Sequence, residues 1–260
     1  MWLPETERVL NILSEEEKIK DYVFIGGSAL SYYLNHRLSE DIDLACPDEF
    51  LKMDKHIDKI MERLREKGFT TDESVESSVN SASKRDFYVN NVKVTFFASG
   101  DDFLKNEKKL LNNNLYIANL DTLIGMKTAV IHHRIVIRDY YDLYVIVKEF
   151  GLEKAINEAS RLYNKKTVDG KECFIFNKTN FLKYAIDMDS IKEDKMESML
   201  NPKYDINKSD IQHFFEEKIK EYISQTIQKI KEIKENMPAK KDAFTKELNE
   251  RNNKKGDPKR

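Results

Sequence analysis

The sequence predicts an α+β fold, in which a small mixed sheet with flanking helices is followed by an α-helical bundle. Residues 1–150 alternate between strand-like and helical patterns, whereas strand signals nearly vanish after residue 150. Beyond residue 235 the chain is rich in charge and poor in apolar side chains. We therefore expect an α/β domain over 1–150, a helical bundle over 151–235 and a charged tail without regular structure over 236–260.

Helices are expected where apolar residues recur at three- and four-residue spacing, and strands where short β-type runs end at glycine or asparagine. The spacing predicts helices over 5–20, 28–37, 48–68, 120–134, 139–150, 152–163, 179–186 and 209–235. Strands are predicted over 22–25, 41–45, 87–89, 92–98 and 115–118, with an extended stretch near 172–176. Asn90 and Asn91 tolerate positive φ and predict a tight hairpin turn between two of these strands.

The composition excludes several classes of protein. Forty-four Lys and Arg against 46 Asp and Glu give a net charge of −2, so no global field favours nucleic acid or membranes. Cys46 and Cys173 fit no metal-ligand spacing, and so few cysteines are typical of a reducing compartment. The N-terminus lacks a signal-peptide pattern, and no window reaches the roughly 18 apolar residues of a membrane span. We expect a cytoplasmic protein without a membrane partner.

Asp41 and Asp43 are the first candidates for chemistry. Residues i and i+2 of a strand share a face, so the two carboxylates project together, and hard oxygen ligands of this kind suit Mg²⁺. Upstream, Gly26 and Gly27 allow a ligand to approach the backbone closely, and Ser28 lies where a helix begins, which attracts phosphate. A metal-ligand pair and a phosphate cradle joined by one helix are the two halves of a nucleoside triphosphate site.

A second Asp-x-Asp pair, Asp187 and Asp189, serves as an internal comparison. It has no glycine pair upstream and no alternating strand pattern, and in helical sequence residues i and i+2 do not share a face. We therefore predict that these two aspartates are solvated surface residues.

The order of strand, Gly-Gly-Ser, helix and strand with Asp-x-Asp resembles the DNA polymerase β-like nucleotidyltransferases. GGSAL followed by RLSEDIDL is similar to the AbiEii/AbiGii toxin family, the abortive-infection nucleotidyltransferases of type IV toxin–antitoxin systems. A second block, LDTLIGMKTAVIHHRIVIRDYYDLYVI, resembles that family's helical lysine followed by R-D-x-x-D-L. The residues carried over from this block are Lys127, Arg138, Asp139 and Asp142. The resemblance covers roughly residues 20–150.

The resemblance implies an enzyme of the EC 2.7.7 type that transfers a nucleoside monophosphate from an NTP to an RNA such as tRNA, or to a protein. It implies a toxin or phage-defence effector with a cognate antitoxin as partner. Two ions of Mg²⁺ or Mn²⁺ would be held by Asp41 and Asp43, and Lys127 would neutralise charge on the phosphates. Asp142 would orient Lys127 or reach the site itself, or would be a surface acid paired with Arg138. The substrate-binding candidates are Gly26, Gly27, Ser28, Arg37, Ser39, Thr95 and Arg138.

One position departs from the polymerase β-like pattern. A third carboxylate usually comes from a neighbouring strand, and the matching residue here is Thr95, which cannot act as a base near neutral pH. Asp86 or Glu40 could take that role, the metal alone could activate the hydroxyl, or catalysis could be weak or lost. The alternatives are thus a transferase, a nucleotide- or RNA-binding protein that keeps the fold without turnover, and a helical protein with an incidental Asp-x-Asp.

Overall fold

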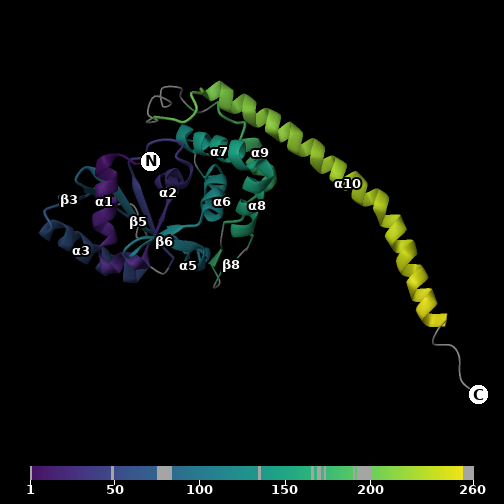
Figure 1. The fold of residues 1–260 in the computed structure, drawn as a ribbon, viewed down its shortest axis with the longest axis horizontal. Helices are drawn as coiled ribbons and strands as arrows, with labels where there is room; N and C mark the ends of the chain where they lie inside the picture. The colour runs from purple at the N-terminus through teal and green to yellow at the C-terminus, as the bar shows by residue number, and fades with distance from the viewer. Residues whose placement is uncertain are drawn as a thin grey trace, which may run out of the picture. The chain divides into compact units, whose positions relative to one another are not determined.

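The structure is a computed structural model that describes residues 2–47, 50–74, 84–133, 136–164, 167–168, 171–172, 174–189, 191 and 201–253. The chain divides into two compact units, Met1–Phe215 and Glu216–Arg260. The first unit contains a seven-stranded mixed sheet with helices around it, which confirms the predicted α+β class (Figure 1). The predicted domain boundary at residue 150 remains a prediction. The helix that follows it, α8 (Leu152–Leu162), packs on the two helices before it within the first unit.

The sheet has the strand order β3-β4-β5-β2-β1-β7-β6. Its strands are β1 (Val23–Ile25), β2 (Ile42–Cys46), β3 (Thr71–Glu73), β4 (Lys84–Val89), β5 (Val92–Ala98), β6 (Lys108–Asn112) and β7 (Leu115–Ala118). All five predicted strands are present. β3 and β6, the two edge strands, were not predicted, because their short polar sequences lack alternation. Asn90 and Asn91 have φ of 46° and 65°, which confirms the hairpin between β4 and β5.

The helices largely follow the predicted positions. Those of the first part are α1 (Pro4–Ser14), followed by a 3₁₀ turn (Glu17–Asp21), α2 (Gly26–Leu34), α3 (Phe50–Glu66), the short α5 (Phe103–Asn106), α6 (Leu120–Val130) and α7 (Ile137–Phe150). Those of the later part are α8 (Leu152–Leu162), α9 (Lys178–Tyr184) and α10 (Lys208–Asn253), with a small hairpin of β8 (Thr167–Val168) and β9 (Lys171–Glu172). α2 starts two residues earlier than predicted, at the first glycine, and ends at Asn35, whose φ is 47°.

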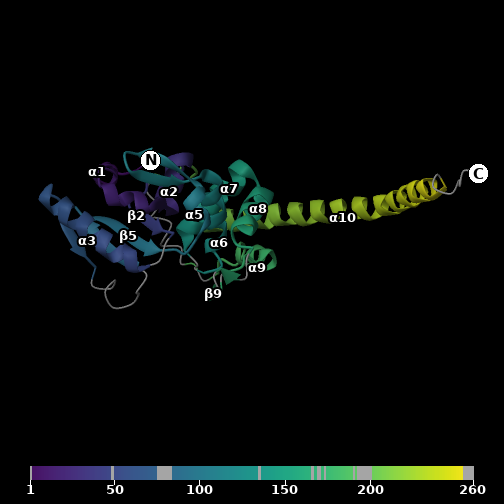
Figure 2. The same ribbon diagram turned by 90° about the horizontal axis from the view of Figure 1, so that it is seen from below.

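Close packing of α6 against α8 positions the end of α8. A Cβ added to Gly125 of α6 would lie 2.7 Å from the Leu162 side chain and 2.9 Å from the Glu158 backbone, so only glycine permits this approach. α6, α7 and α8 lie side by side in both views of the ribbon (Figure 2).

The second unit consists of the part of α10 that follows Phe215. The sequence predicts an unstructured tail from residue 236, whereas the helix continues to Asn253; residues 254–260 lie outside the described part. Ten of the 18 residues over 236–253 are Lys, Ala, Glu, Arg, Met or Leu, which favour a helix, whereas Pro238 and four Asn do not. On α10, Ile223, Ile227, Ile230 and Ile233 are exposed. Within the described residues, no helix combines the length and the apolar character needed to cross a membrane.

Candidate active site

Four side chains form one row across the centre of the sheet. Ile25 pairs with Asp43, Asp43 with Thr95, and Thr95 with Asp86, so β1, β2, β5 and β4 each contribute one neighbour. Directly paired residues point to the same face of a sheet, and the row therefore places Asp43 beside Thr95. The Thr95 hydroxyl donates a hydrogen bond of 2.7 Å to Asp86 Oδ1.

The first glycine lies against the second aspartate. Gly26 has a φ of +79°, and a Cβ there would collide with the carboxylate of Asp43. Any other residue would thus be strained twice, by its backbone conformation and by the collision. A Cβ added to Gly27 would likewise collide with the guanidinium of Arg37. The glycine pair is explained by two charged side chains that pack onto the backbone at the start of α2.

The Ser28 hydroxyl joins the start of α2 to the segment before β2. It makes a hydrogen bond with the Ser39 hydroxyl and a short one to the backbone carbonyl of Asp41. Both serines are buried. Trp2 adds a 2.8 Å hydrogen bond from its indole Nε1 to the Ser28 carbonyl. Ser28 therefore helps to fix the backbone from which Asp41 projects.

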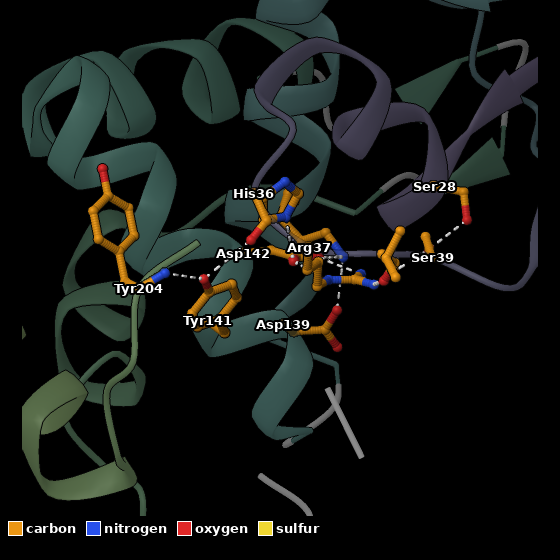
Figure 3. Close-up of polar contacts among 10 residues, drawn as sticks. Ser28, His36, Arg37, Ser39, Asp139, Tyr141, Asp142 and Tyr204 are labelled. Carbon is orange, nitrogen blue, oxygen red and sulfur yellow. Dashed lines mark hydrogen bonds and ion pairs between the residues drawn. The ribbon is translucent and has the colours of Figure 1, made fainter. Parts of the chain in front are cut away.

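Asp142 of α7 is a fully buried hub for three basic side chains (Figure 3). Its Oδ1 accepts hydrogen bonds of 2.7 Å from His36 Nε2 and from Arg37 Nε. Its Oδ2 accepts one of 3.1 Å from Arg37 Nη2 and lies 2.9 Å from Lys127 Nζ. Lys127 is also 2.8 Å from Asp139 Oδ1. The alternative of a surface acid paired with Arg138 is therefore wrong, because α7 turns Asp142 into the core.

The charges around Asp142 and Lys127 determine the protonation state of each. Burial would raise the pKa of Asp142, but Arg37, Lys127 and the hydrogen bond from His36 hold it well below its ordinary value. Burial likewise acts to lower the pKa of Lys127, yet Asp142 and Asp139 raise it above its usual range. Asp142 is therefore an anion and Lys127 a cation throughout the physiological pH range.

His36 is a member of this hub that sequence reasoning missed. Burial lowers its pKa despite the neighbouring Asp142, so it is neutral near pH 7 and donates through Nε2. Its Nδ1 has no hydrogen-bond partner among the described residues. The His36 carbonyl accepts a 2.7 Å hydrogen bond from the Lys203 backbone and one of 3.1 Å from the Tyr141 hydroxyl. Only the adjacency to Arg37 could have signalled its role.

A cavity of about 730 Å³ opens over this region. Most of the predicted site residues line it: Gly26, Gly27, Ser28, Arg37, Ser39, Asp41, Asp43, Thr95, Lys127 and Arg138. We call these residues, together with Asp139, the charged wall. Asp142 does not line the cavity and lies behind Arg37 and Lys127. Among the described residues, no ion-pair partner of Arg138 is found.

Part of the lining of the same cavity is apolar. Leu123, Met126, Val130, Tyr163 and Phe174 line it there, and we call these five residues the apolar wall. They come from α6, the end of α8 and the chain before α9. Sequence reasoning missed this wall because the packing of α6 on α8, not a local motif, brings the residues together.

Of the two carboxylates considered as replacements at the Thr95 position, the structure brings only Asp86 into the row. Asp86 is 8% exposed, and Lys84 Nζ lies 2.8 Å from its Oδ2. Burial opposes ionisation, but Lys84, Thr95 and Lys93 together lower the pKa of Asp86. Glu40 is exposed, and neither it nor Asp86 is among the residues that line the cavity.

The comparison pair behaves as expected. Asp187 and Asp189 are both exposed, beyond the end of α9. Cys46 is buried, and Cys173 lies outside the described residues. Within the described residues, no group of three or more His, Cys, Asp or Glu side chains is arranged to hold a metal ion.

Known proteins resemble this chain in sequence and fold. A protein of Aquifex aeolicus (strain VF5), itself named as uncharacterized, is 24% identical over 207 residues, which cover 78% of this chain and 88% of that protein. MenT4, a nucleotidyltransferase toxin from Mycobacterium tuberculosis H37Rv, superposes with a TM-score of 0.52 at 15% identity, covering 82% of this chain and 81% of MenT4. JHP933 from Helicobacter pylori gives a TM-score of 0.49 at 17% identity, covering 87% and 97%.

The sequence profile described as "Nucleotidyl transferase AbiEii toxin, Type IV TA system" matches residues 8–223. This segment includes every residue of the charged wall and of the apolar wall. The MenT4 superposition shows independently that the fold is that of a nucleotidyltransferase. The chain therefore belongs to the AbiEii family of nucleotidyltransferase toxins of type IV toxin–antitoxin systems.

Proposed function

We propose that the protein transfers a nucleoside monophosphate from an NTP to an RNA acceptor such as tRNA, or to a protein hydroxyl, as the toxin of a type IV toxin–antitoxin pair with a cognate antitoxin. The observation that carries the proposal is the contact of Gly26 with Asp43 in the charged wall. It places an open backbone turn, suited to phosphate, against a carboxylate that suits a metal.

The donor set at Asp41 and Asp43 fits a hard divalent cation, Mg²⁺ or Mn²⁺. Both carboxylates line the cavity, and the absence of a side chain at Gly26 allows the Asp43 carboxylate to lie against the backbone there. With two protein carboxylates available, the remaining ligands would come from the triphosphate and from water, which is the usual binding mode of Mg²⁺. A bound divalent cation, or a pair of them, would neutralise charge on the triphosphate.

The protein's own residues would divide the remaining tasks. Gly26 and Gly27 would present backbone N–H groups to the outgoing phosphates. Arg37 and Lys127, held in place by Asp142, would supply fixed positive charge that needs no reorganisation during the reaction. Arg138 would contact the substrate from the start of α7.

Thr95 would contact the acceptor hydroxyl. Its hydrogen is directed at Asp86, so a lone pair of its oxygen can accept a hydrogen bond from the acceptor hydroxyl. In the transfer, the hydroxyl oxygen bonds to the α-phosphorus, the bond from that phosphorus to the bridging oxygen breaks, and pyrophosphate leaves with the electron pair. The hydroxyl proton passes to solvent.

A second candidate function is nucleotide or RNA binding without turnover. It is favoured by Thr95, which supplies a neutral group where the fold commonly supplies a carboxylate. The pairing of Lys127 with two carboxylates also favours it, because that charge is already compensated within the protein.

Incubation of the protein with each radiolabelled NTP, Mg²⁺ and total RNA separates these functions. We expect label on RNA or protein for at least one NTP, lost in Asp43→Ala and retained in the matched Asp189→Ala variant. Nucleotide binding without transfer for all four NTPs would favour the binding protein. Absence of Mg²⁺-dependent NTP binding would contradict both transfer and nucleotide binding and would favour an incidental Asp-x-Asp.

A further inference from the structure

Four isoleucines of α10 form an exposed apolar stripe in the second unit. Their exposed fractions lie between 45% and 62%, whereas Ile211 and Phe215, at the start of the same helix, are buried. We call these four residues the isoleucine stripe: Ile223, Ile227, Ile230 and Ile233. An exposed β-branched side chain is a poorer helix former than Ala, Lys or Glu and gains little from burial. The stripe therefore adds little to the stability of α10 itself, and a contiguous exposed apolar surface is typical of an interaction site.

The spacing of the stripe fits a helical partner. Ile223, Ile227 and Ile230 stand at positions i, i+4 and i+7, and Ile233 follows about one turn later. At about 3.6 residues per turn these positions share one face of α10 over roughly three turns. Anchors with this spacing are those by which an amphipathic helix packs against a second helix or an apolar groove. The stripe therefore presents a long, narrow apolar face.

The charges of α10 are sorted around the stripe. On a helix, residues three or four positions apart are neighbours. Residues 216–235 contain five lysines and five glutamates; four of the lysines have a neighbour in the stripe, and none of the glutamates has one. These four lysines are all exposed: Lys220, Lys229, Lys231 and Lys234. The stripe is thus bordered by positive charge, and the negative charge of the segment lies on the other faces of the helix.

This arrangement of charge disfavours two other occupants. In a pair of α10 helices from two copies of the chain, the residues that border one stripe would face those that border the other, so lysine would meet lysine. A membrane surface binds helices with an excess of Lys and Arg and with Trp, Phe or Leu on the apolar face. Residues 216–235 have no net charge and contain no Trp, Phe or Leu. What suits the stripe is an apolar surface bordered by Asp and Glu.

We propose that the isoleucine stripe is the docking surface for an acidic amphipathic helix of another protein. The apolar face of that helix packs on the four isoleucines, and its Asp and Glu side chains pair with the lysines at the border. Burial of the stripe supplies most of the affinity, and the lysines select an acidic partner over a basic one. None of these residues lines the cavity, so the inference does not depend on the proposed function.

Two synthetic helices of three heptads each test this surface. Both carry leucine at the a and d positions, and they carry either glutamate or lysine at e and g. We expect fluorescence anisotropy to show that the full-length protein binds the acidic helix at least about ten-fold more tightly than the basic one, because each exposed ion pair contributes up to a few-fold. The preference should shrink in high salt, since exposed ion pairs are screened.

Paired substitutions separate the apolar contact from the helix itself. Ile227→Ala with Ile230→Ala removes apolar area and should weaken binding of the acidic helix by about ten-fold or more. Gln225→Ala with Gln228→Ala changes two residues that have no neighbour in the stripe, and this control should bind as wild type. Alanine favours a helix, so neither pair should melt α10, and far-UV circular dichroism checks this.

A second comparison separates the border lysines from the net charge. Lys220→Gln with Lys234→Gln, and Gln225→Glu with Gln228→Glu, each lower the net charge of the protein by two. Only the lysine variant should reduce the preference for the acidic helix, since the two glutamines lie away from the stripe. An equal reduction in both variants would show that net charge causes the preference and would overturn the proposal.

The remaining outcomes concern the other occupants. Equal binding of the acidic and the basic helix would contradict the proposal directly. A wild-type dimer in light scattering that Ile227→Ala with Ile230→Ala dissociates would assign the stripe to a second copy of the chain. Co-sedimentation with vesicles of phosphatidylcholine and phosphatidylglycerol, lost in the same variant, would assign it to a lipid surface. A monomer that stays in the supernatant and prefers the acidic helix supports the docking surface.

Discussion

Arg37 donates hydrogen bonds to both carboxylate oxygens of Asp142, with Nε 2.7 Å from Oδ1 and Nη2 3.1 Å from Oδ2. The two residues are 105 positions apart in the sequence and both are buried. Arg37 lies between α2 and β2, on the segment that leads to Asp41, whereas Asp142 lies on α7. This bidentate ion pair therefore ties the segment that leads to Asp41 to a helix outside the sheet.

Replacement of Asp142 by Asn should destabilise the protein by about 3–5 kcal/mol, the cost of leaving buried charges without their partner. Arg37 and Lys127 would both lose their shared anion, although Lys127 keeps Asp139. Urea-induced unfolding of wild type and variant measures the difference.

The matched control for Asp142→Asn is Glu149→Gln on the same helix. Glu149 also has a basic partner, Lys203 Nζ at 2.8 Å, but this pair is exposed to solvent. Exposed pairs contribute about 0–1 kcal/mol. If the two variants lost similar stability, the buried hub would not be the structural support inferred here.

Gly26→Ala should impair both folding and nucleotide binding. The new Cβ would require a φ of +79° and would meet the Asp43 carboxylate, so either the turn or the carboxylate must move. Gly68→Ala is the matched control, because Gly68 has a φ of +85° but nothing within 4 Å of an added Cβ. Both variants carry the backbone strain, and only Gly26→Ala should lose Mg²⁺-dependent NTP binding. Equal loss in the two would show that strain alone is responsible.

The local motifs of the charged wall could be predicted from sequence, because they depend on short-range rules. The glycine turn, the Asp-x-Asp strand and the Asn90 turn each depend on φ preferences or on strand alternation. The location of Asp142 could not, since helical spacing alone pairs it equally well with Arg138 on the surface. Its burial depends on which face of α7 turns toward the rest of the unit, and that is decided by packing over long sequence distances.

The apolar wall was beyond sequence reasoning for a related reason. Tyr163 follows α8, and its place at the cavity depends on the close approach that Gly125 allows. Edge strands β3 and β6 were missed because solvent-facing polar strands lack the alternation that marks a half-buried strand.

The stability of the protein should fall as the pH drops below about 6.5, and His36 should cause part of this loss. Its pKa is lowered from the ordinary 6.5 by burial, so between the folded-state pKa and 6.5 the unfolded chain binds more protons than the folded one. Stability then rises with pH in this window, by up to about 1.4 kcal/mol per pH unit for one group. Protonation would also place a donor at Nδ1, which has no partner among the described residues.

His36→Gln removes this titration while its amide can still donate to Asp142. Thermal unfolding from pH 7.5 to 5 should therefore show a shallower dependence in this variant than in wild type. His56→Gln is the control, because His56 is only half-buried, with Asp21 3.0 Å away. Parallel curves for wild type and His36→Gln would contradict a lowered pKa of His36 in the folded protein.

Thr95 and Asp86 should act as one unit in the transfer reaction. The hydrogen bond of 2.7 Å between them orients the Thr95 hydroxyl beside Asp43, so both Thr95→Val and Asp86→Asn should slow transfer, by about ten-fold or more for the valine variant. Thr95→Ser keeps the hydroxyl and should retain most activity. We expect the loss in kcat for the acceptor reaction, with the KM for NTP little changed, since Thr95 is proposed to contact the acceptor.

The double variant distinguishes cooperation from independent roles. If Asp86 acts through Thr95, Asp86→Asn should add little to Thr95→Val, because the group that it orients is already absent. If instead Asp86→Asn slowed transfer by the same factor in both backgrounds, Asp86 would act on the reaction independently of Thr95. Unfolding measurements on all four proteins of the cycle are needed alongside, since Asp86 also pairs with Lys84 and its removal leaves that cation without its nearest carboxylate. Unchanged kcat in Thr95→Val, with full stability, would remove Thr95 from the acceptor site.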